Sequence, residues 1–400
     1  MKKLILFGAG KIGRSFIGQL FSLSGYEVVF VDILEPIIEA LNKRGFYNVV
    51  IKGDKEEIIK VTNVRGIIAS DKEKVIEEVS TSDIVASAVG NNALPYIIPL
   101  IAQGLIKRFS KDRNLPLDII IAENMRDAAE YFEKEIVKIV ENDYPLKKLV
   151  GLVETSIGKM VPIMSKKDID EDILQIFAES YNNLILDKKA FKNPIPNVKG
   201  LSPKDNMKAW VDRKLFIHNL GHATISYMGY LYDKKFVYLY EALAIRELYN
   251  QTKETMMQAS EILMKEYPSE FTGKDLEDHI DDLLKRFMNK ALGDTIYRVG
   301  KDLLRKLGPE DRLVGAIKKG LTHNINIDKI LYALVCGFYF RATDESGTMF
   351  DRDIEFVAKY FKNDIEYVLV NVCGFDKSKH KDIFEKCKKY SEKIKILYKI

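Results

Sequence analysis

The sequence has 400 residues, of which 46% are hydrophobic and 30% charged, and this predicts a folded protein of two or three domains. Its 62 Lys and Arg are interleaved with 58 Asp and Glu, so the net charge of +4 gives no argument for nucleic-acid binding. No apolar run approaches the roughly 18 residues of a membrane span. Three cysteines without a C-x-x-C pair favour a reducing compartment, and we expect a cytoplasmic protein without membrane partners.

The first half of the chain alternates short apolar runs with amphipathic segments. The apolar runs predict strands at 3–8, 26–32, 83–90, 117–125 and 149–157. Helices are predicted between them at 11–25, 35–45, 71–83, 94–109 and 125–140, and 47–53 and 60–70 are predicted as an extra pair of strands. This alternation indicates an α/β domain with a doubly wound, mostly parallel, Rossmann-like sheet.

The pattern changes after NPIPNVKG (193–200), where two prolines, two asparagines and a glycine predict a domain crossing. Beyond it the apolar residues recur with a helical period, for example over 238–267, 279–289, 327–340 and 353–369. We therefore predict two domains, a Rossmann-like domain over 1–192 and an all-α domain over 193–400.

A glycine pattern, Gly8-x-Gly10-x-x-Gly13, lies between the first strand and the first helix. In this context the first glycine allows a tight turn, the second lets the backbone approach a pyrophosphate, and the third lets helix and strand pack closely. The helix N-terminus adds unpaired N–H groups for the phosphates. The dinucleotide-binding residues predicted in this loop are Gly8, Ala9, Gly10, Ile12 and Gly13.

Asp32 ends the second strand, 19 residues after Gly13. A carboxylate at this place accepts hydrogen bonds from both hydroxyls of the adenosine ribose and repels a 2′-phosphate. Ile33 and Leu34 come next and supply no arginine to bind such a phosphate. The sequence therefore favours NAD over NADP as the cofactor.

Two later strands also end in polar residues. Gly90 and Asn91 follow the strand at 83–90, and Glu123 and Asn124 end the strand at 117–125. Because open α/β sheets bind ligands at the carboxyl ends of their strands, we expect these residues to reach the nicotinamide half of the cofactor. An ordinary strand-end turn is the alternative for both asparagines.

The segment RKLFIHNLGHA (213–223) places polar residues within an apolar helix. At about 100° per residue, Lys214, His222 and Asn219 fall within an arc of about 140°. A lysine whose pKa is lowered by burial and by nearby positive charge can take a hydroxyl proton, while Asn219 and His222 hold the oxygen. The alternative is an exposed lysine beside a hydrogen-bonded core histidine.

Several of these segments resemble the polyol-specific long-chain dehydrogenases. The likeness rests on FGAGKIGRSFIGQL, ENM, GLVETSIGKMVP, RKLFIHNLGHA and GLTHNINIDKILYALVCGFYFR, and covers about residues 1–342. The resemblance implies that Lys214 is the general base, that Asn219 and Asn124 hold the oxyanion, and that His222 positions the substrate oxygen. It implies no metal, in keeping with a chain that has no Cys/His ligand cluster.

The sequence predicts the type of reaction more narrowly than it predicts the substrate. Members of that family commonly read Val-Asp-Arg where this chain has Ile157-Gly158-Lys159, so Lys159 keeps one positive charge of the pair. A substrate phosphate requires Arg or Lys, and RVGKDLLRKLGPEDRL offers Arg298 and Arg305. His323 is a further substrate-binding candidate. A solvated surface is the alternative for these side chains.

We expect an NAD-dependent enzyme that interconverts D-mannitol 1-phosphate and D-fructose 6-phosphate, with a sugar phosphate or polyol as its small-molecule partner. A mannitol 2-dehydrogenase or a hexuronate reductase acting on fructuronate or tagaturonate is the nearest alternative. A non-catalytic NAD(H) sensor is the alternative of another class, and Lys214 argues against it because a sensor needs no base. We expect a monomer or a small homo-oligomer.

Overall fold

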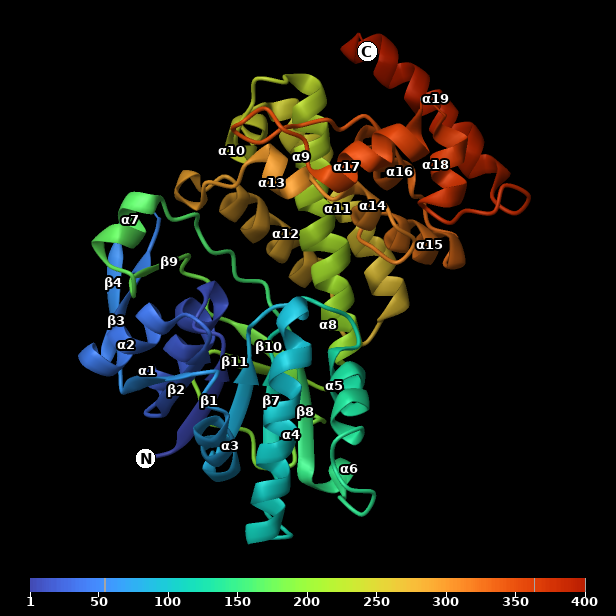
Figure 1. The fold of residues 1–400 in the computed structure, drawn as a ribbon. Helices are drawn as coiled ribbons and strands as arrows, with labels where there is room; N and C mark the ends of the chain where they lie inside the picture. Colours follow the sequence, from blue (N-terminus) through green and yellow to red (C-terminus); the bar gives the residue numbers. More distant parts are fainter. Residues whose placement is uncertain (54, 363, 400) are drawn as a thin grey trace. The chain divides into compact units, whose positions relative to one another are not determined.

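The computed structural model describes residues 1–53, 55–362 and 364–399. It divides into two compact units, Met1–Val211 and Asp212–Ile400 (Figure 1). The segment 193–200 has neither helix nor strand and leads into the last strand of the first unit.

The first unit is built on an eight-stranded sheet with the order β11-β10-β8-β7-β6-β1-β2-β5. Every neighbouring pair is parallel except β8 and β10. The strands are β1 (Lys3–Phe7), β2 (Glu27–Asp32), β5 (Val64–Ile68), β6 (Ile84–Ser87), β7 (Leu117–Ile121), β8 (Val150–Ser156), β10 (Leu184–Asp187) and β11 (Leu201–Lys204). The prediction of a doubly wound, mostly parallel sheet is confirmed.

Helices cover both faces of this sheet, because successive side chains of each buried strand enter opposite cores. Leu4 and Leu6 of β1 belong to one apolar core, and Ile5 and Phe7 belong to the other. The helical segments of this unit are η1 (Gly13–Gly18), α1 (Gln19–Leu23), α2 (Glu35–Arg44), α3 (Lys72–Thr81), η2 (Asn91–Ala93), α4 (Leu94–Lys111), α5 (Ala128–Val137), α6 (Leu146–Leu149) and α7 (Lys166–Glu171).

A small second sheet, with the order β4-β3-β9, contains β3 (Phe46–Ile51), β4 (Glu57–Thr62) and β9 (Ile176–Ala178). The predicted strand at 47–53 is β3. The predicted strand at 60–70 divides into the end of β4 and the whole of β5, which joins the main sheet. The three- and four-residue strands β9, β10 and β11 are too short to produce a readable alternation in the sequence.

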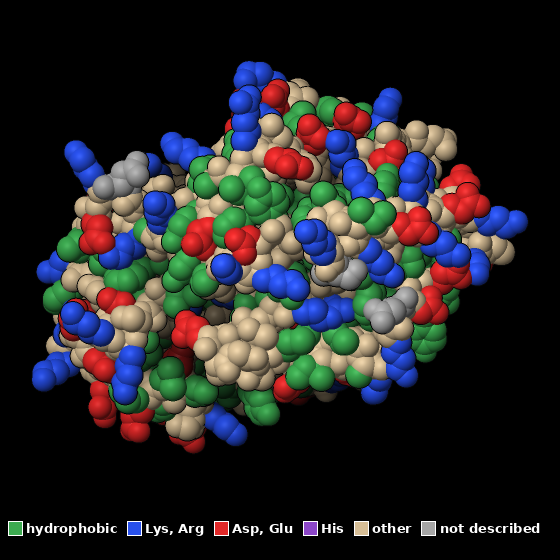
Figure 2. All heavy atoms as spheres, turned by 90° about the horizontal axis from the view of Figure 1, so that it is seen from above, with side chains coloured by type: hydrophobic (Ala, Val, Ile, Leu, Met, Phe, Trp, Pro, Cys, Tyr) green, Lys and Arg blue, Asp and Glu red, His purple; other side chains and the backbone are tan. Residues whose placement is uncertain are grey.

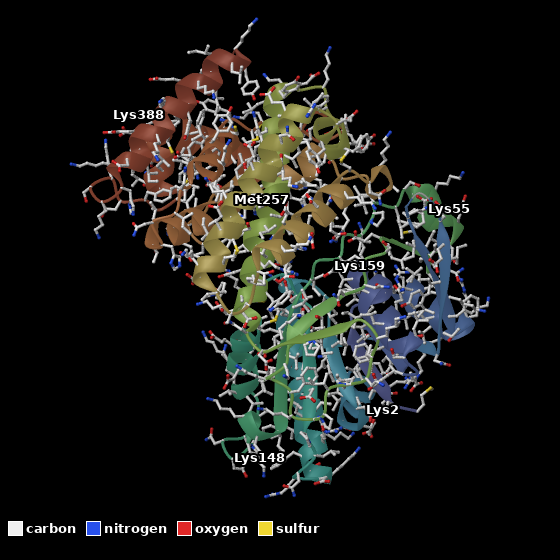
Figure 3. The ribbon with its side chains drawn as sticks, turned by 180° about the vertical axis from the view of Figure 1, so that it is seen from behind. Lys2, Lys55, Lys148, Lys159, Met257 and Lys388 are labelled. Carbon is white, nitrogen blue, oxygen red and sulfur yellow. The ribbon has the colours of Figure 1, made fainter. Side chains whose placement is uncertain are left out.

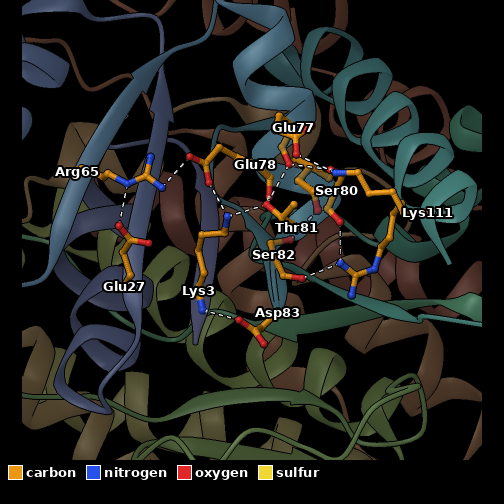
Figure 4. Close-up of polar contacts among 12 residues, drawn as sticks. Lys3, Glu27, Arg65, Glu77, Glu78, Ser80, Thr81, Ser82, Asp83 and Lys111 are labelled. Atoms are coloured by element: carbon orange, nitrogen blue, oxygen red, sulfur yellow. Dashed lines mark hydrogen bonds and ion pairs between the residues drawn. The ribbon is translucent and has the colours of Figure 1, made fainter. Parts of the chain in front are cut away.

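An ion-pair network fastens α3 to the amino ends of the central strands (Figure 4). Lys3 Nζ lies 2.6 Å from Glu78 Oε2, and Arg65 contacts Glu27 and Glu78 at 2.8 and 2.7 Å. Lys3 and Glu27 are the first residues of β1 and β2. The network therefore stabilises the edge opposite to the one where ligands of such sheets bind.

The second unit is helical. It contains no strand among the described residues after β11, so the predicted helical domain is confirmed. Its predicted start at residue 193 is wrong, because β11 lies within 193–400 and pairs with the sheet of the first unit, and the second unit begins at Asp212. Its segments are η3 (Lys214–Asn219), α9 (Leu220–Tyr232), α10 (Leu239–Leu243), α11 (Arg246–Glu266), α12 (Gly273–Phe287), η4 (Lys290–Leu292), α13 (Ile296–Gly300), α14 (Leu303–Lys306), α15 (Val314–Thr322), α16 (Asp328–Phe338), α17 (Asp351–Glu355), η5 (Phe356–Phe361), α18 (Ile365–Asn371) and α19 (Lys381–Tyr398); α8 (Met207–Arg213) precedes them.

Helix α9 is the central element of this unit and packs against α10, α11, α13 and α16. Most of its residues are buried, which suits an apolar sequence without a polar face. Charged side chains of both signs are interspersed on the surface seen in Figure 2. Within the described residues, no helix combines the length and the apolar character that crossing a membrane requires.

Candidate active site

The glycine loop between β1 and η1 has the geometry that a pyrophosphate needs. Gly8 has φ +98°, and a Cβ there would lie 2.5 Å from the carbonyl oxygen of Ala88. A Cβ on Gly13 would overlap the carbonyl oxygen of Gly8. At Gly10 a Cβ would meet no atom within 4 Å, so the backbone there is open to a ligand. Each glycine thus meets the requirement predicted for it.

Asp32 lies at the end of β2, against this loop. Its Oδ2 accepts a hydrogen bond from Ala9 N at 2.7 Å, and its Oδ1 accepts one from Leu34 N at 3.0 Å. A carboxylate oxygen has more than one lone pair, so both oxygens keep acceptor capacity for ribose hydroxyls. The loop, the helix that begins beside it and this acid together fit NAD.

Arg14, the second residue of η1, is a buried residue that no sequence motif singles out. Its Nε donates to Ala9 O at 2.7 Å, and its Nη1 donates to Ile173 O and Leu174 O at 2.9 and 2.8 Å. Burial lowers the pKa of its guanidinium. Arg14 therefore ties the glycine loop to the segment that leads into β9, and its position directly after Gly13 is the only signal in the sequence.

Glu123 shapes the turn that follows β6. Its Oε1 accepts from Val89 N at 3.0 Å and its Oε2 from Gly90 N at 2.8 Å, and burial raises the pKa of the carboxyl. Gly90 has φ +84°, a conformation that favours glycine. Asn91 and Asn124 are exposed at the carboxyl ends of β6 and β7, as the topology predicts.

Lys159 lies within the N-terminal unit, where Figure 3 labels it. Its side chain is buried; Nζ donates to Asn182 Oδ1 at 2.6 Å and lies 5.2 Å from the ring centroid of Phe16 in η1. The neighbouring Gly158 has room for a side chain, because a Cβ there would meet Tyr181 Oη at 3.5 Å, an ordinary contact. A Cβ would therefore fit at this position without moving the backbone.

The segment from Lys214 to Asn219 is a π-helix, η3, inserted between α8 and α9. The following Leu220 N accordingly bonds to Leu215 O, five residues back. Since i→i+5 bonding stacks residues five apart, Lys214 and Asn219 lie on one face, whereas an α-helix would turn them about 140° apart. π-Helical turns occur frequently at functional sites.

Lys214 has the properties of a base that works near neutral pH. Burial, followed by the positive charge of Arg312, lowers its pKa to about 8. Arg312 is held in place because its Nε donates to Asp311 Oδ1 at 2.7 Å and its Nη1 donates to Asn219 O at 3.3 Å. Arg312 thus contacts the same turn whose lysine it influences.

His222 lies in the first turn of α9. Its ring stacks on Phe287 of α12 with centroids 3.8 Å apart, and the ring of His218 lies 5.0 Å away. Burial, together with Arg298 and Arg312, holds the pKa of His222 well below its ordinary value, so the imidazole is neutral. Asp294 Oδ2 lies 3.6 Å from its Nε2.

The two arginines predicted to bind phosphate have different surroundings. Arg298 pairs with Oδ1 of Asp294, the same carboxylate that faces His222. Arg305 pairs with Asp302 and Asp311 at 2.6 and 3.2 Å, and its side chain is half exposed. The structure therefore brings Arg298, but not Arg305, into one cluster with His222.

His323 lies at the end of α15, where its Nε2 contacts Glu266 Oε2 at 2.7 Å. Lys319 also pairs with Glu266, and it lies 3.5 Å from the buried Asp212. Among the residues that the structure describes, no group of three His, Cys, Asp or Glu is arranged to hold a metal ion.

Comparisons with known proteins agree with this geometry. Residues 2–200 match the mannitol dehydrogenase Rossmann domain, and residues 206–376 match the mannitol dehydrogenase C-terminal domain. A mannitol-1-phosphate 5-dehydrogenase of Shouchella clausii is 37% identical over 351 residues, covering 86% of this chain and 90% of that protein. One of Lactococcus lactis subsp. cremoris (strain MG1363) is 31% identical, covering 95% and 96%.

Two solved structures share the fold at low sequence identity. A D-sorbitol dehydrogenase in substrate-free form superposes with a TM-score of 0.81 at 17% identity, covering 98% of this chain and 92% of that one. A Pseudomonas fluorescens mannitol 2-dehydrogenase, solved with NAD and D-mannitol, gives 0.69 at 16% identity, covering 98% and 94%.

The family matches over both halves of the chain and the similar proteins show an NAD-dependent polyol dehydrogenase. The chain belongs to the mannitol dehydrogenase family, as both of its domain matches show. The expected resemblance, fold class and cofactor are confirmed.

Proposed function

We propose that this enzyme interconverts D-mannitol 1-phosphate and D-fructose 6-phosphate, with Lys214 as the general base. The observation that carries the reaction is the lowered pKa of Lys214, on the same π-helical face as Asn219. Two proteins named mannitol-1-phosphate 5-dehydrogenase, 37% and 31% identical to this chain over most of its length, support the phosphorylated substrate.

Proton transfer is the work of Lys214. Bound NAD would supply the hydride acceptor for the alcohol carbon, and bound NADH the hydride donor for the ketone. Neutral Lys214 takes the hydroxyl proton as the alcohol is oxidised, and its ammonium form gives the proton back to the oxygen in the reverse direction. A pKa of about 8 keeps both forms populated near neutral pH.

Amide and imidazole groups hold the reacting oxygen. The Asn219 amide donates to the oxygen as negative charge develops on it, and the Asn124 amide is the second proposed donor. Neutral His222 has one N–H to donate and orients the same oxygen. Fixed donors of this kind cost no reorganisation during the reaction, which is why they accelerate it.

Arg298 is the best-supported ligand for the substrate phosphate. A guanidinium binds phosphate through two parallel N–H groups, and Arg298 shares Asp294 with His222. Lys159, Arg305 and His323 are further substrate-binding candidates. Arg305 is the weakest of them, because two carboxylates already neutralise it.

The test is NADH oxidation by the purified protein with fructose 6-phosphate, fructose, fructuronate and tagaturonate in parallel. Turnover with fructose 6-phosphate should exceed that with fructose by about a hundredfold or more, equivalent to ~2.8 kcal/mol of phosphate recognition. Activity with an unphosphorylated ketose or a hexuronate alone would leave the lysine mechanism in place and refute the phosphorylated substrate. NADH binding without turnover on any of the four would refute the reaction.

A further inference from the structure

A pocket within the helical unit lies away from the Lys-Asn-His segment. It encloses about 560 Å³, which is within the usual range for small-molecule sites. Tyr230 and Leu231, near the end of α9, form one wall. Tyr230 is eight residues after His222, or about 12 Å further along the helix at 1.5 Å per residue.

The charge of this pocket has one sign. Four basic side chains line it, Lys234, Arg341, Lys362 and Lys395, and none of the described lining residues is acidic. No ion pair involving these four occurs among the described residues, although the protein as a whole has nearly as many acids as bases. A multivalent anion in this pocket would therefore meet four cations and no carboxylate among the described lining residues.

Arg341, one of the lining cations, is held in place by neighbouring groups. Its Nη1 donates to Phe338 O and Phe340 O at 2.8 and 2.6 Å, and its guanidinium lies 4.7 Å from the ring centroid of Phe361. Burial lowers its pKa to about 10, which leaves it charged at neutral pH. An arginine held on three sides keeps its remaining donors in one orientation, which suits a phosphate oxygen.

Lys362 adopts a strained backbone conformation beside the pocket. It has φ +34° and ψ +32°, in the left-handed region where residues with a Cβ are uncommon. It ends the π-helix η5, whose Val357 and Phe361 line the same pocket. Strained residues and π-helical turns concentrate at ligand sites, because the strain is kept where it serves binding.

The last basic residue comes from the C-terminal helix α19. Lys395 reaches the pocket from a segment that lies beyond residue 376, where the family match ends. The apolar part of the lining, with the Tyr339 and Phe361 rings 5.2 Å apart, suits the carbon skeleton of an organic ligand. The cations suit its phosphate groups.

We propose that this pocket binds a small organic phosphate carrying at least two negative charges, at a site separate from the catalytic one. The proposal does not depend on which polyol the enzyme oxidises. A sugar bisphosphate and a nucleoside triphosphate share this chemistry. Because three of the four cations are exposed lysines, the affinity should fall as salt concentration rises.

The experiment is calorimetric titration of the full-length protein, saturated with NADH, using pyrophosphate, fructose 1,6-bisphosphate and ATP as separate probes. We expect at least one of the two organic probes to bind. The probe that binds shows whether the ligand is a sugar bisphosphate or a nucleoside triphosphate. The doubly substituted protein Lys234→Glu/Lys395→Glu should bind it about tenfold or more weakly, as expected from losing charge-assisted contacts. Lys393→Glu, on the same helix but outside the lining, is the matched control and should bind normally.

Turnover of the polyol substrate should be unchanged in all these proteins, which verifies their folding. If neither fructose 1,6-bisphosphate nor ATP binds, the proposal is wrong. It is also wrong if Lys393→Glu weakens binding as much as the double substitution does. Lys362→Gly gives a second test, because glycine relieves the left-handed strain while removing a charge. It should raise the melting temperature and weaken anion binding, and unweakened binding would also overturn the site.

Discussion

His222 Nε2 and Asp294 Oδ2 lie 3.6 Å apart, and neither atom has a hydrogen-bond partner among the described residues. The other oxygen of Asp294 pairs with Arg298, and the His222 ring stacks on Phe287. The distance exceeds that of a direct hydrogen bond, so the single N–H of the neutral ring is not committed to this carboxylate. Asp294 thus connects the residue proposed to hold the substrate oxygen with the one proposed to bind its phosphate.

Replacement of Asp294 should therefore impair catalysis more than cofactor binding. For Asp294→Leu we expect kcat/KM for fructose 6-phosphate to fall by about ten- to a hundredfold, because Arg298 loses its partner and the His222 ring loses its orientation. The dissociation constant of NADH, measured by fluorescence titration, should not change. Asp278→Asn, which removes a surface pair with Lys274, is the control, and an equal effect there would contradict the assignment.

Lys214→Ala removes the proposed base. We expect kcat to fall by about 10² to 10⁴-fold, the usual contribution of a positioned acid or base, while NADH still binds. Stopped-flow measurement of NADH oxidation, together with NADH titration, separates these two effects. Retention of most of the turnover would exclude Lys214 as the base.

The rates of alcohol oxidation and of ketone reduction should change in opposite directions as the pH rises. Alcohol oxidation needs neutral Lys214, so its rate should rise with pH through about 8; ketone reduction needs the ammonium form, so its rate should fall over the same range. The measurement is kcat against pH in both directions at saturating cofactor. If kcat rose with pH in both directions, or fell in both, Lys214 would not be the base.

Arg312→Met tests whether the positive charge of Arg312 lowers the pKa of Lys214. Without the arginine charge, the pKa of Lys214 should rise, and the midpoint of the oxidation profile should move to higher pH by a few tenths of a unit to about one unit. Arg44→Met is the control, since that arginine pairs with Asp172 within the first unit and touches none of these groups. A midpoint that does not move, or that moves equally in both variants, would show that burial alone sets the pKa.

The geometry of the glycine loop could be predicted from the sequence because it depends on local rules. A strand, three glycines, a helix and an acid follow one another within the first 32 residues, and each has a conformational requirement of its own. The glycine geometry and the place of Asp32 match those requirements. The main strands were predictable for the same reason, since each is a continuous apolar run.

The C-terminal site was less predictable because its geometry depends on tertiary contacts. A regular helical period puts Lys214 and Asn219 at the two ends of an arc of about 140°, and nothing in six residues of sequence indicates the π-helix that brings them closer together on one face. Asp294 and Phe287 come from distant segments that meet His222 only in the fold. Arg298 and Arg305 look equivalent in the sequence, and only their carboxylate partners distinguish them.

Asp32 should determine which cofactor the enzyme accepts. Asp32→Asn keeps an acceptor oxygen for the backbone N–H of Ala9 but removes the charge that repels a 2′-phosphate. We expect KM for NAD to rise about tenfold, through loss of charge-assisted bonds to ribose, and the preference for NAD over NADP to narrow. Asp71→Asn is the matched control, because that carboxylate also accepts a backbone N–H but only caps α3. If the ratio of kcat/KM values for NAD and NADP were the same in wild type and Asp32→Asn, recognition of the adenosine ribose would have to rest on other groups.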